Sequence, residues 1–271
     1  MIVQIYEIQT PREVDAIVDL GVDHVGSVLL DEQEWADKTL KSTIERVQKF
    51  GRKSSLIPLF SSLDSISRAA DYYRPDILHF CETLPAFPGD ERMLGELLDC
   101  QESIKQRFPQ IDLMRSVPIG SAGQAEFYPS LALAAAFEPI SDWFLTDTLL
   151  GENANAVSEE QPVNGFVGIT GKTCDWTVAG QLVANSSIPV ILAGGIGPGN
   201  VESAILEVKP AGVDSCTLTN AVAEDGKPIR FQKDLKKIGA MVSAARLADA
   251  QLAVSRQYPR LNNDVTRISG K

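Results

Sequence analysis

Short apolar strands alternate with helix-forming segments along most of the chain, and this alternation limits the possible folds more than any other feature. Strands are predicted at residues 2–6, 22–30, 55–60, 77–81, 111–117, 143–147, 189–193 and 213–215, where apolar and β-branched residues gather. Eight strand–helix units of about 30 residues each are the repeat of a (β/α)8 TIM barrel. An open doubly wound sheet is the alternative, but its glycine loop usually follows the first strand, which here ends in Tyr6-Glu7-Ile8. The sequence therefore predicts a single-domain α/β barrel.

The segments between the strands predict the helices and the domain limits. Helices are expected at residues 11–20, 38–50, 65–73, 91–108, 124–137, 176–184, 201–208 and 231–254. Pro58 within the third strand indicates a bulge or an early strand end. We expect the barrel to span residues 1–256. The polar, acidic segment 151–162 has too little apolar surface to order itself and is expected to be a mobile loop, and residues 257–271 form a weakly basic, frayed tail.

Charge and hydropathy restrict the partners that this chain can have. The net charge is -11 and Lys and Arg form no sustained run, so nucleic acid is not an expected partner. The apolar runs fall far short of the roughly 20 residues that a membrane helix needs, and the N-terminus lacks a signal-peptide pattern. We therefore expect a cytoplasmic protein whose partner is a small molecule rather than a nucleic acid or a membrane, and we keep a homodimer open as its assembly state.

Cysteine and histidine usage argues against a metal site. The four cysteines are scattered without a C-x-x-C pair, and the two histidines do not complete a zinc-binding pattern. Unpaired thiols in a chain of this size are typical of a reducing compartment. Neither a structural metal nor a cofactor is expected.

Glycines follow the seventh predicted strand. Gly194 and Gly195 separate this strand from the helix expected at 201–208. Glycine lets the backbone approach a ligand closely, and a helix N-terminus presents free N–H groups and the positive end of its dipole. This pattern favours a phosphate, although a tight strand-to-helix turn is the alternative. The run Gly171-Lys172-Thr173 looks like the end of a P-loop, but the spacing to a preceding glycine fails, so nucleotide binding is not expected.

Two aspartates end predicted strands and would lie at the mouth of the barrel. Asp147 ends the sixth strand, where loss of hydration would raise its pKa and suit it to acid catalysis. Its alternative role is a helix N-cap or a surface turn. Asp214 lies in the eighth strand and would complete an acid–base pair. However, Asp23 occurs in the same Gly-Val-Asp context, so Asp214 could instead be a recurrent strand-edge residue.

Four motifs occur in a fixed order: FLTD at 144–147, GITGKTCDW at 168–176, VILAGGI at 190–196 and GVDS at 212–215. They resemble the phosphoribosylanthranilate isomerase family of tryptophan biosynthesis, which reads LLD, GGTGKTFDW, LAGGL and GVDVSSG at these points. A fainter resemblance extends back to residue 1 through VDHVG at 22–26 and PDILHFC at 75–81.

The resemblance implies a barrel enzyme and an Amadori rearrangement, in which a ribose phosphate carrying anthranilate changes from an aldose to a ketose. By resemblance, Asp147 is the general acid that opens the sugar ring. The residues that the resemblance places at the substrate phosphate are Thr170, Gly171, Lys172, Gly194, Gly195, Ser215 and Cys216.

Three departures from the family fall on residues that the resemblance assigns to the chemistry. The family base is a cysteine in a KICG run, and here the run reads QIYE, with Tyr6 in the place of the cysteine. A phenol with a pKa near 10 is a poor base at neutral pH. The arginine that the resemblance implies for the anthranilate carboxylate has no counterpart in the acidic segment 30–35. After the eighth strand, Ser215-Cys216-Thr217 replaces Ser-Ser-Gly and loses the glycine.

A replacement base is therefore expected among three residues. Asp214 is preferred, because it is on the inner face and matches a family aspartate. Glu7 follows Tyr6 and would face away from the barrel unless a bulge turned it inward. Cys81 stands where the family has a histidine, and its thiolate could act as the base, whereas burial would keep the thiol inert.

Three functions stay open on the sequence. An isomerase of a phosphorylated aminosugar is preferred, because Asp147 and the glycine segments are retained. A lyase, aldolase or epimerase of the same fold, acting on another small phosphorylated or carboxylated molecule, is favoured by the changed ends of the first two strands. The third is a non-catalytic ligand-binding relative, since barrels support many functions.

Overall fold

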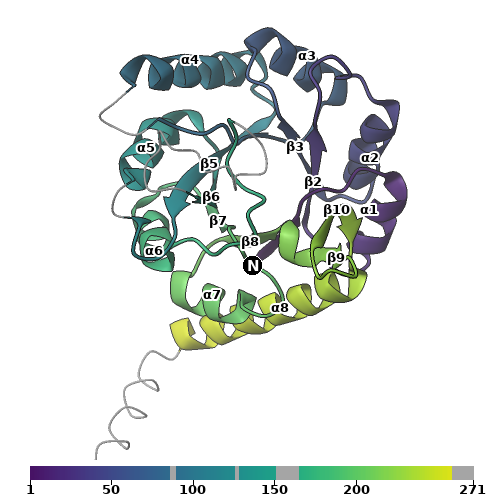
Figure 1. Ribbon diagram of the computed structural model, residues 1–271, viewed down its shortest axis with the longest axis vertical. Helices are drawn as coiled ribbons and strands as arrows, with labels where there is room; N and C mark the ends of the chain where they lie inside the picture. Colours follow the sequence, from purple (N-terminus) through teal and green to yellow (C-terminus); the bar gives the residue numbers. More distant parts are fainter. Residues whose placement is uncertain (86–89, 126–127, 151–164, 258–271) are drawn as a thin grey trace, which may run out of the picture.

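Parallel strands close into a barrel surrounded by helices (Figure 1). The computed structural model describes residues 1–85, 90–125, 128–150 and 165–257. The strands of the barrel are β1 (Ile2–Ile5), β2 (His24–Leu29), β3 (Lys53–Pro58), β4 (Ile77–Phe80), β5 (Asp112–Gly120), β6 (Trp143–Leu149), β7 (Val190–Leu192) and β8 (Gly212–Ser215). The helices are α1 (Pro11–Val18), α2 (Lys38–Lys49), α3 (Leu63–Tyr73), α4 (Glu91–Arg107), α5 (Ser130–Phe137), α6 (Trp176–Asn185), α7 (Val201–Val208) and α8 (Leu235–Gln257). The predicted (β/α)8 barrel is confirmed.

Side chains on each strand alternate between the barrel interior and the layer beneath the helices. On β1, Val3 and Ile5 belong to the core shared with the outer helices, whereas Tyr6, just after the strand, packs inside the barrel. The buried apolar residues of the interior are Tyr6, Val28, Ile77, Met114, Leu145, Ile191 and Ala193. The interior is thus filled by side chains, as barrels of this kind are, and ligands must bind at the strand ends.

Parallel pairing of β1 with β8 closes the barrel. In this register Gln4 lies opposite Asp214 and Ile5 lies opposite Ser215. The closure therefore brings the first strand next to one of the two predicted catalytic carboxyl groups.

Two predicted helix boundaries are wrong. The helix expected from residue 124 begins only at Ser130, because Pro129 has no N–H to donate and is disfavoured inside a helix. The helix expected from Phe231 begins at Leu235, and residues before it form a hairpin of β9 (Asn220–Val222) and β10 (Pro228–Lys233). Pro58 ends β3, which confirms the early strand end.

Some predictions concern residues that the structure does not describe. The predicted loop 151–162 and nearly all of the predicted tail, from residue 258 on, lie outside the described residues, so the domain limits stay predictions. None of the described helices combines the length and the apolar content needed to cross a membrane.

Candidate active site

Two adjoining pockets open at the carboxyl ends of the strands. The first, of about 330 Å³, is lined by Asp147, Ile169, Thr170, Gly171, Ala193, Gly194, Gly195, Ile196, Asp214, Ser215, Cys216, Thr217 and Leu218. The second, of about 550 Å³, is lined by Tyr6, Glu7, Val28, Ile57, Leu59, His79, Cys81, Leu145, Asp147, Phe166, Val167, Gly168, Ile169, Asp214 and Cys216. Both pockets share Asp147, Ile169, Asp214 and Cys216. Together they therefore form one continuous site.

Asp147 lies within β6 and retains some exposed surface. Its Oδ1 accepts a hydrogen bond of 2.8 Å from the Thr148 amide, but loss of hydration dominates and raises its pKa to about 7. Gly168 packs directly on this carboxyl group, since a Cβ at that position would lie 2.3 Å from Oδ2. The alternative role of Asp147 as an N-cap is excluded, because the residue belongs to a strand.

Asp214 projects from β8 and is 6% exposed. The Gln4 side-chain amide donates to its Oδ1 at 3.1 Å. Burial raises the pKa of Asp214 to about 8, and the nearby Asp147 carboxyl group adds to this increase. By contrast, Asp23 accepts from the amide of Val3 and pairs with Arg246 on α8. The shared Gly-Val-Asp context therefore leads to different environments, and Asp214 is not a surface strand-edge residue.

A neutral polar cluster occupies the place of the family cysteine. The Tyr6 hydroxyl hydrogen-bonds to Ser55 Oγ at 2.5 Å and to His79 Nδ1 at 2.6 Å, and His79 Nε2 bonds to Ser116 Oγ at 2.9 Å. Burial raises the pKa of Tyr6 well above its ordinary value and lowers the pKa of His79 to about 3. Both groups are therefore neutral at pH 7, and Tyr6 is unsuited to act as a base.

Cys81 lines the second pocket and is 4% exposed. Burial raises the pKa of its thiol well above the ordinary value, and the carboxyl groups of Glu82 and Asp147 add to the increase. A protonated thiol is a poor proton acceptor. Cys81 is consequently a weaker candidate for the base than Asp214.

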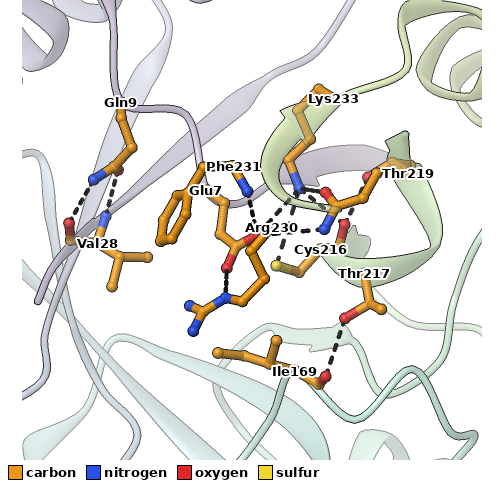
Figure 2. A network of polar contacts seen from close by, with 11 residues as sticks. Glu7, Gln9, Val28, Ile169, Cys216, Thr217, Thr219, Arg230, Phe231 and Lys233 are labelled. Atoms are coloured by element: carbon orange, nitrogen blue, oxygen red, sulfur yellow. Dashed lines mark hydrogen bonds and ion pairs between the residues drawn. The ribbon is translucent and has the colours of Figure 1, made fainter. Parts of the chain in front are cut away.

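Glu7 reaches the second pocket through a left-handed backbone conformation, with φ of 63°, rather than through a bulge. Its carboxylate accepts from Arg230 Nε at 2.7 Å and lies 3.9 Å from Lys233 Nζ (Figure 2). Burial alone would raise the pKa of Glu7, but the two cations together lower it. Glu7 is thus held as a paired carboxylate, which makes it a weak base.

Glycines shape the first pocket. Gly194 and Gly195 have φ of +84° and +62°, and a Cβ at Gly195 would lie 2.5 Å from the backbone carbon of Lys172. The Asn200 side chain holds the turn by donating to the Gly195 carbonyl at 2.8 Å and accepting from the Gly197 amide at 2.9 Å. Because these glycines have no side chain, the turn after β7 can contact the backbone of the loop that contains Lys172 at the wall of the first pocket.

Six of the seven predicted phosphate-binding residues line the first pocket: Thr170, Gly171, Gly194, Gly195, Ser215 and Cys216. The exception is Lys172, whose carbonyl accepts from Thr148 Oγ1 at 2.6 Å behind the pocket. Ser215 Oγ is buried and has no hydrogen-bond partner among the described residues. Burial of Cys216 raises the pKa of its thiol, so no negative charge arises there.

Sequence reasoning missed Gln4 and the β9–β10 hairpin, which supplies Arg230 and Lys233. The hairpin could have been found from Asp225-Gly226, a strong turn signal between two extended segments. Among the described residues, no group of three or more His, Cys, Asp or Glu side chains is arranged to hold a metal ion.

The fold and the two pockets define a (β/α)8 barrel protein with a pair of enclosed carboxyl groups in a small-molecule site. The sequence profile of the N-(5'phosphoribosyl)anthranilate (PRA) isomerase family matches residues 141–244. A curated N-(5'-phosphoribosyl)anthranilate isomerase of Pseudomonas fluorescens is 31% identical over 159 residues, which cover 59% of this chain and 67% of the relative. The chain belongs to this family, as its motifs predicted.

Other similarities extend over nearly the full length. The N-(5'-phosphoribosyl)anthranilate isomerase of Methanothrix thermoacetophila is 27% identical over 242 residues, covering 87% of this chain and 97% of the relative. A crystal structure of phosphoribosyl anthranilate isomerase in complex with reduced 1-(o-carboxyphenylamino)-1-deoxyribulose 5-phosphate aligns with a TM-score of 0.63. It covers 91% of this chain and 99% of the other, at 17% identity, and so supports the fold.

Proposed function

We propose that this protein is an N-(5'-phosphoribosyl)anthranilate isomerase, which converts an aldose phosphate into a ketose phosphate by an Amadori rearrangement. The observation that carries the proposal is that Asp147 and Asp214 line both pockets and that burial raises the pKa of each carboxyl group. Two coupled carboxyl groups near neutral pH can hold one proton between them. The pKa of Asp214, about 8 against about 7 for Asp147, favours the proton on Asp214, so the mechanism uses the less populated arrangement in which Asp147 holds the proton and Asp214 is ionised.

In the proposed mechanism, Asp147 donates its proton to the ring oxygen of the sugar. The C1–O bond breaks, and the nitrogen lone pair forms a protonated imine with C1. The Asp214 carboxylate then removes the C2 proton, which gives a neutral enol with a C1=C2 double bond. The enol becomes the ketose when Asp214 returns this proton to C1 and the enol hydroxyl gives its proton to the Asp147 carboxylate, so that both carboxyl groups end as they began. Gln4 keeps the Asp214 carboxylate oriented by donating to its Oδ1. No atom is gained or lost, as an isomerisation requires.

The two pockets differ in the parts of this substrate that they suit. The first presents glycine backbone and the Ser215 hydroxyl, which has no hydrogen-bond partner in the part of the chain that the structure describes, and this suits a phosphate. The second is larger and has apolar walls from Val28, Ile57, Leu59 and Leu145, which fits an aromatic ring. The carboxyl pair shared by the pockets would then face the sugar between phosphate and ring.

The direct test follows the fluorescence of anthranilate as purified protein meets freshly generated phosphoribosylanthranilate. We expect turnover by the wild type and a loss of about 10²–10⁴ in kcat for Asp147→Asn, the usual contribution of a general acid. Binding of reduced 1-(o-carboxyphenylamino)-1-deoxyribulose 5-phosphate, the reduced product analogue, should persist in the variant. Absence of turnover by the wild type contradicts the proposal, and undiminished turnover by Asp147→Asn removes this residue from the mechanism.

A different reaction on another phosphorylated molecule is the second candidate, and the Tyr6 cluster favours it. The hydroxyl of Tyr6 and the ring of His79 fill the place of the family base with neutral groups. Thermal stabilisation by simple sugar phosphates without isomerase turnover would support this candidate. A non-catalytic relative is expected to show neither turnover nor a requirement for Asp147.

The partner that we propose is a small phosphorylated substrate. A homodimer and a cytoplasmic location stay predictions. Light scattering of the purified protein would measure the first, and fractionation of cells the second.

A further inference from the structure

The β9–β10 hairpin buries two cations against a single carboxylate. Glu7 and Lys233 have side chains that are 1% and 2% exposed, and that of Arg230 is 34% exposed. The Glu7 carboxylate lies 2.7 Å from Arg230 and 3.9 Å from Lys233. This cluster of Glu7, Arg230 and Lys233 therefore carries one positive charge in excess, in a protein whose net charge is -11.

Lys233 is fully occupied inside the cluster. Its ammonium group donates to the Cys216 carbonyl at 2.9 Å and to Asn220 Oδ1 at 2.5 Å, besides lying near Glu7. An ammonium group has three N–H donors. Lys233 therefore fixes the hairpin to the end of β8 and has little capacity left for a ligand.

Arg230 uses only part of its donor capacity. Its Nε donates to Glu7, while its Nη2 is buried and has no hydrogen-bond partner among the described residues. A guanidinium group has five N–H donors, and a buried unpaired donor is unfavourable. The excess charge of the cluster is thus located on a group that can still bind an anion.

The guanidinium group of Arg230, which is not itself a lining residue, pairs with Glu7, which lines the second pocket. In Figure 2 it extends from the hairpin past Glu7 in the direction of Ile169. Glu7 and Ile169 both line the second pocket, whose other walls are largely apolar. Arg230 also stacks on Phe231, with its Cζ 4.8 Å from the ring centre, which restricts its position.

Backbone strain is concentrated around this guanidinium group. Glu7, Ile169 and Phe231 have φ of 63°, 63° and 60°, a region that bulky residues rarely adopt. The other two described non-glycine residues with positive φ, Arg74 and Lys209, are C-caps of helices, where this conformation is common. Strain of this kind persists where the surrounding structure enforces it, often at binding sites.

We propose that Arg230 binds the carboxylate on the aromatic ring of the substrate. This inference rests on the proposed function, because anthranilate carries such a carboxylate next to its nitrogen. The acidic segment after β2 contains Asp31, Glu32 and Glu34 and supplies no cation. The β9–β10 hairpin would provide the cation for the carboxylate from the other side of the second pocket. Glu7 is then the positioning residue, because its carboxylate accepts from Arg230 Nε.

The test compares two ligands that differ only in the carboxylate: reduced 1-(o-carboxyphenylamino)-1-deoxyribulose 5-phosphate and its counterpart with an unsubstituted phenyl ring. Dissociation constants of both are measured by calorimetry for the wild type, Arg230→Gln and Arg230→Lys. Lys227→Gln is the matched control, because Lys227 lies next to β10 in the same hairpin but is 81% exposed and pairs with Asp225. Thermal unfolding verifies that each variant is folded.

We expect the carboxylate to strengthen binding by the wild type and Lys227→Gln about 10- to 100-fold, as one hydrogen bond between charged groups does. This ratio should fall to near one in Arg230→Gln and recover in part in Arg230→Lys. An unchanged ratio in folded Arg230→Gln, a ratio near one in the wild type, or no binding of either ligand would overturn the proposal. A large ratio in the wild type without turnover would instead contradict the proposed isomerase function alone.

Discussion

At the scale of single residues, the site depends on carboxyl groups that the fold removes from water. Asp147 and Asp214 come from strands that are not adjacent, yet both face the same space. Among the described residues, few groups compensate for the lost hydration, because Asp147 accepts one backbone hydrogen bond and Asp214 one side-chain hydrogen bond. Their raised pKa values are the consequence.

The raised pKa of Asp147 predicts a pH-dependent effect of Asp147→Asn on stability. The unfolded carboxyl group has a pKa near 3.9, and the folded one has a pKa of about 7. Between these values the folded protein binds the extra proton, so the wild type loses stability as pH rises from about 4 to 7. Asn cannot ionise, and the variant should therefore gain in Tm relative to the wild type over this range.

Thermal unfolding at pH 5 and pH 8 measures this difference. We expect the advantage of Asp147→Asn to be larger at pH 8, by several degrees, since about 1 kcal/mol changes Tm by roughly 2–4 °C in chains of about this size. Asp19→Asn is the control for the removal of one carboxylate, because Asp19 is exposed and lines neither pocket. If the Tm of Asp147→Asn relative to that of the wild type fell as pH rises, the raised pKa of Asp147 in the folded protein would be contradicted.

At the scale of elements, the loops that meet at the first pocket are predicted to be sensitive to one added methyl group. In Gly195→Ala, the Cβ would lie 2.5 Å from the backbone of Lys172, at a φ that disfavours alanine. We expect binding of the reduced product analogue to weaken at least about tenfold, because the backbone that we propose faces the phosphate must move. Calorimetry gives the dissociation constant.

Gly199→Ala is the matched control, since a Cβ there meets no atom within 4 Å. It should bind the analogue as the wild type does. Equal affinities of Gly195→Ala and Gly199→Ala would show that the glycine turn does not contact the ligand.

The β9–β10 hairpin is predicted to lose stability when Glu7, the buried anion that pairs with its two cations, is neutralised. Glu7→Gln leaves Lys233 and Arg230 without a counter-charge, and removing one partner of a buried pair is strongly unfavourable. We expect a loss of about 2–4 kcal/mol, toward the lower part of the usual range because Arg230 is partly exposed. Chemical denaturation measures it.

Asp225→Asn provides the comparison, because Asp225 and Lys227 form an exposed pair at the hairpin tip. The free energy of unfolding of Asp225→Asn should fall by less than about 1 kcal/mol. Similar losses in both variants would mean that Glu7 is not the electrostatic anchor of the hairpin.

These elements also show how far the sequence could be interpreted. The eight strands, Asp147, Asp214 and the glycine turn were predictable, because apolar runs and the residues that end them are local signals. The hairpin was missed although Asp225-Gly226 signals its turn, because Phe231 and its neighbours were assigned to the long helix that follows. Nor could Glu7 be placed, since its left-handed conformation depends on contacts with residues more than 200 positions away.

At the scale of the whole molecule, the two ends of the barrel have different roles. At the amino ends of the strands, Arg246 on α8 bonds to Asp23 and to the carbonyls of Met1 and Gly21, and the N-terminal ammonium group pairs with Asp249. These contacts join the last helix to the first strand–helix unit, and so they secure the closure of the barrel far from the pockets.

Arg246→Ala is accordingly predicted to reduce stability without affecting catalysis. The loss should be about 1–2 kcal/mol, because the contacts are partly exposed to solvent. Urea unfolding gives the free energy, and the anthranilate fluorescence assay gives kcat/KM, which should equal that of the wild type. A marked fall in kcat/KM of the folded variant would contradict this division of roles.

The packing of Tyr6 has a consequence for the evolutionary path of this chain. Its ring lies so close to Gly26 that a Cβ there would approach within 2.1 Å. Restoring the family cysteine at position 6 would remove a buried ring, leave a cavity and unpair Ser55 and His79, at roughly 3–5 kcal/mol. A thiol at position 6 is therefore disfavoured as a single change, and it would need accompanying changes at Gly26, Ser55 and His79, the residues that the tyrosine now contacts.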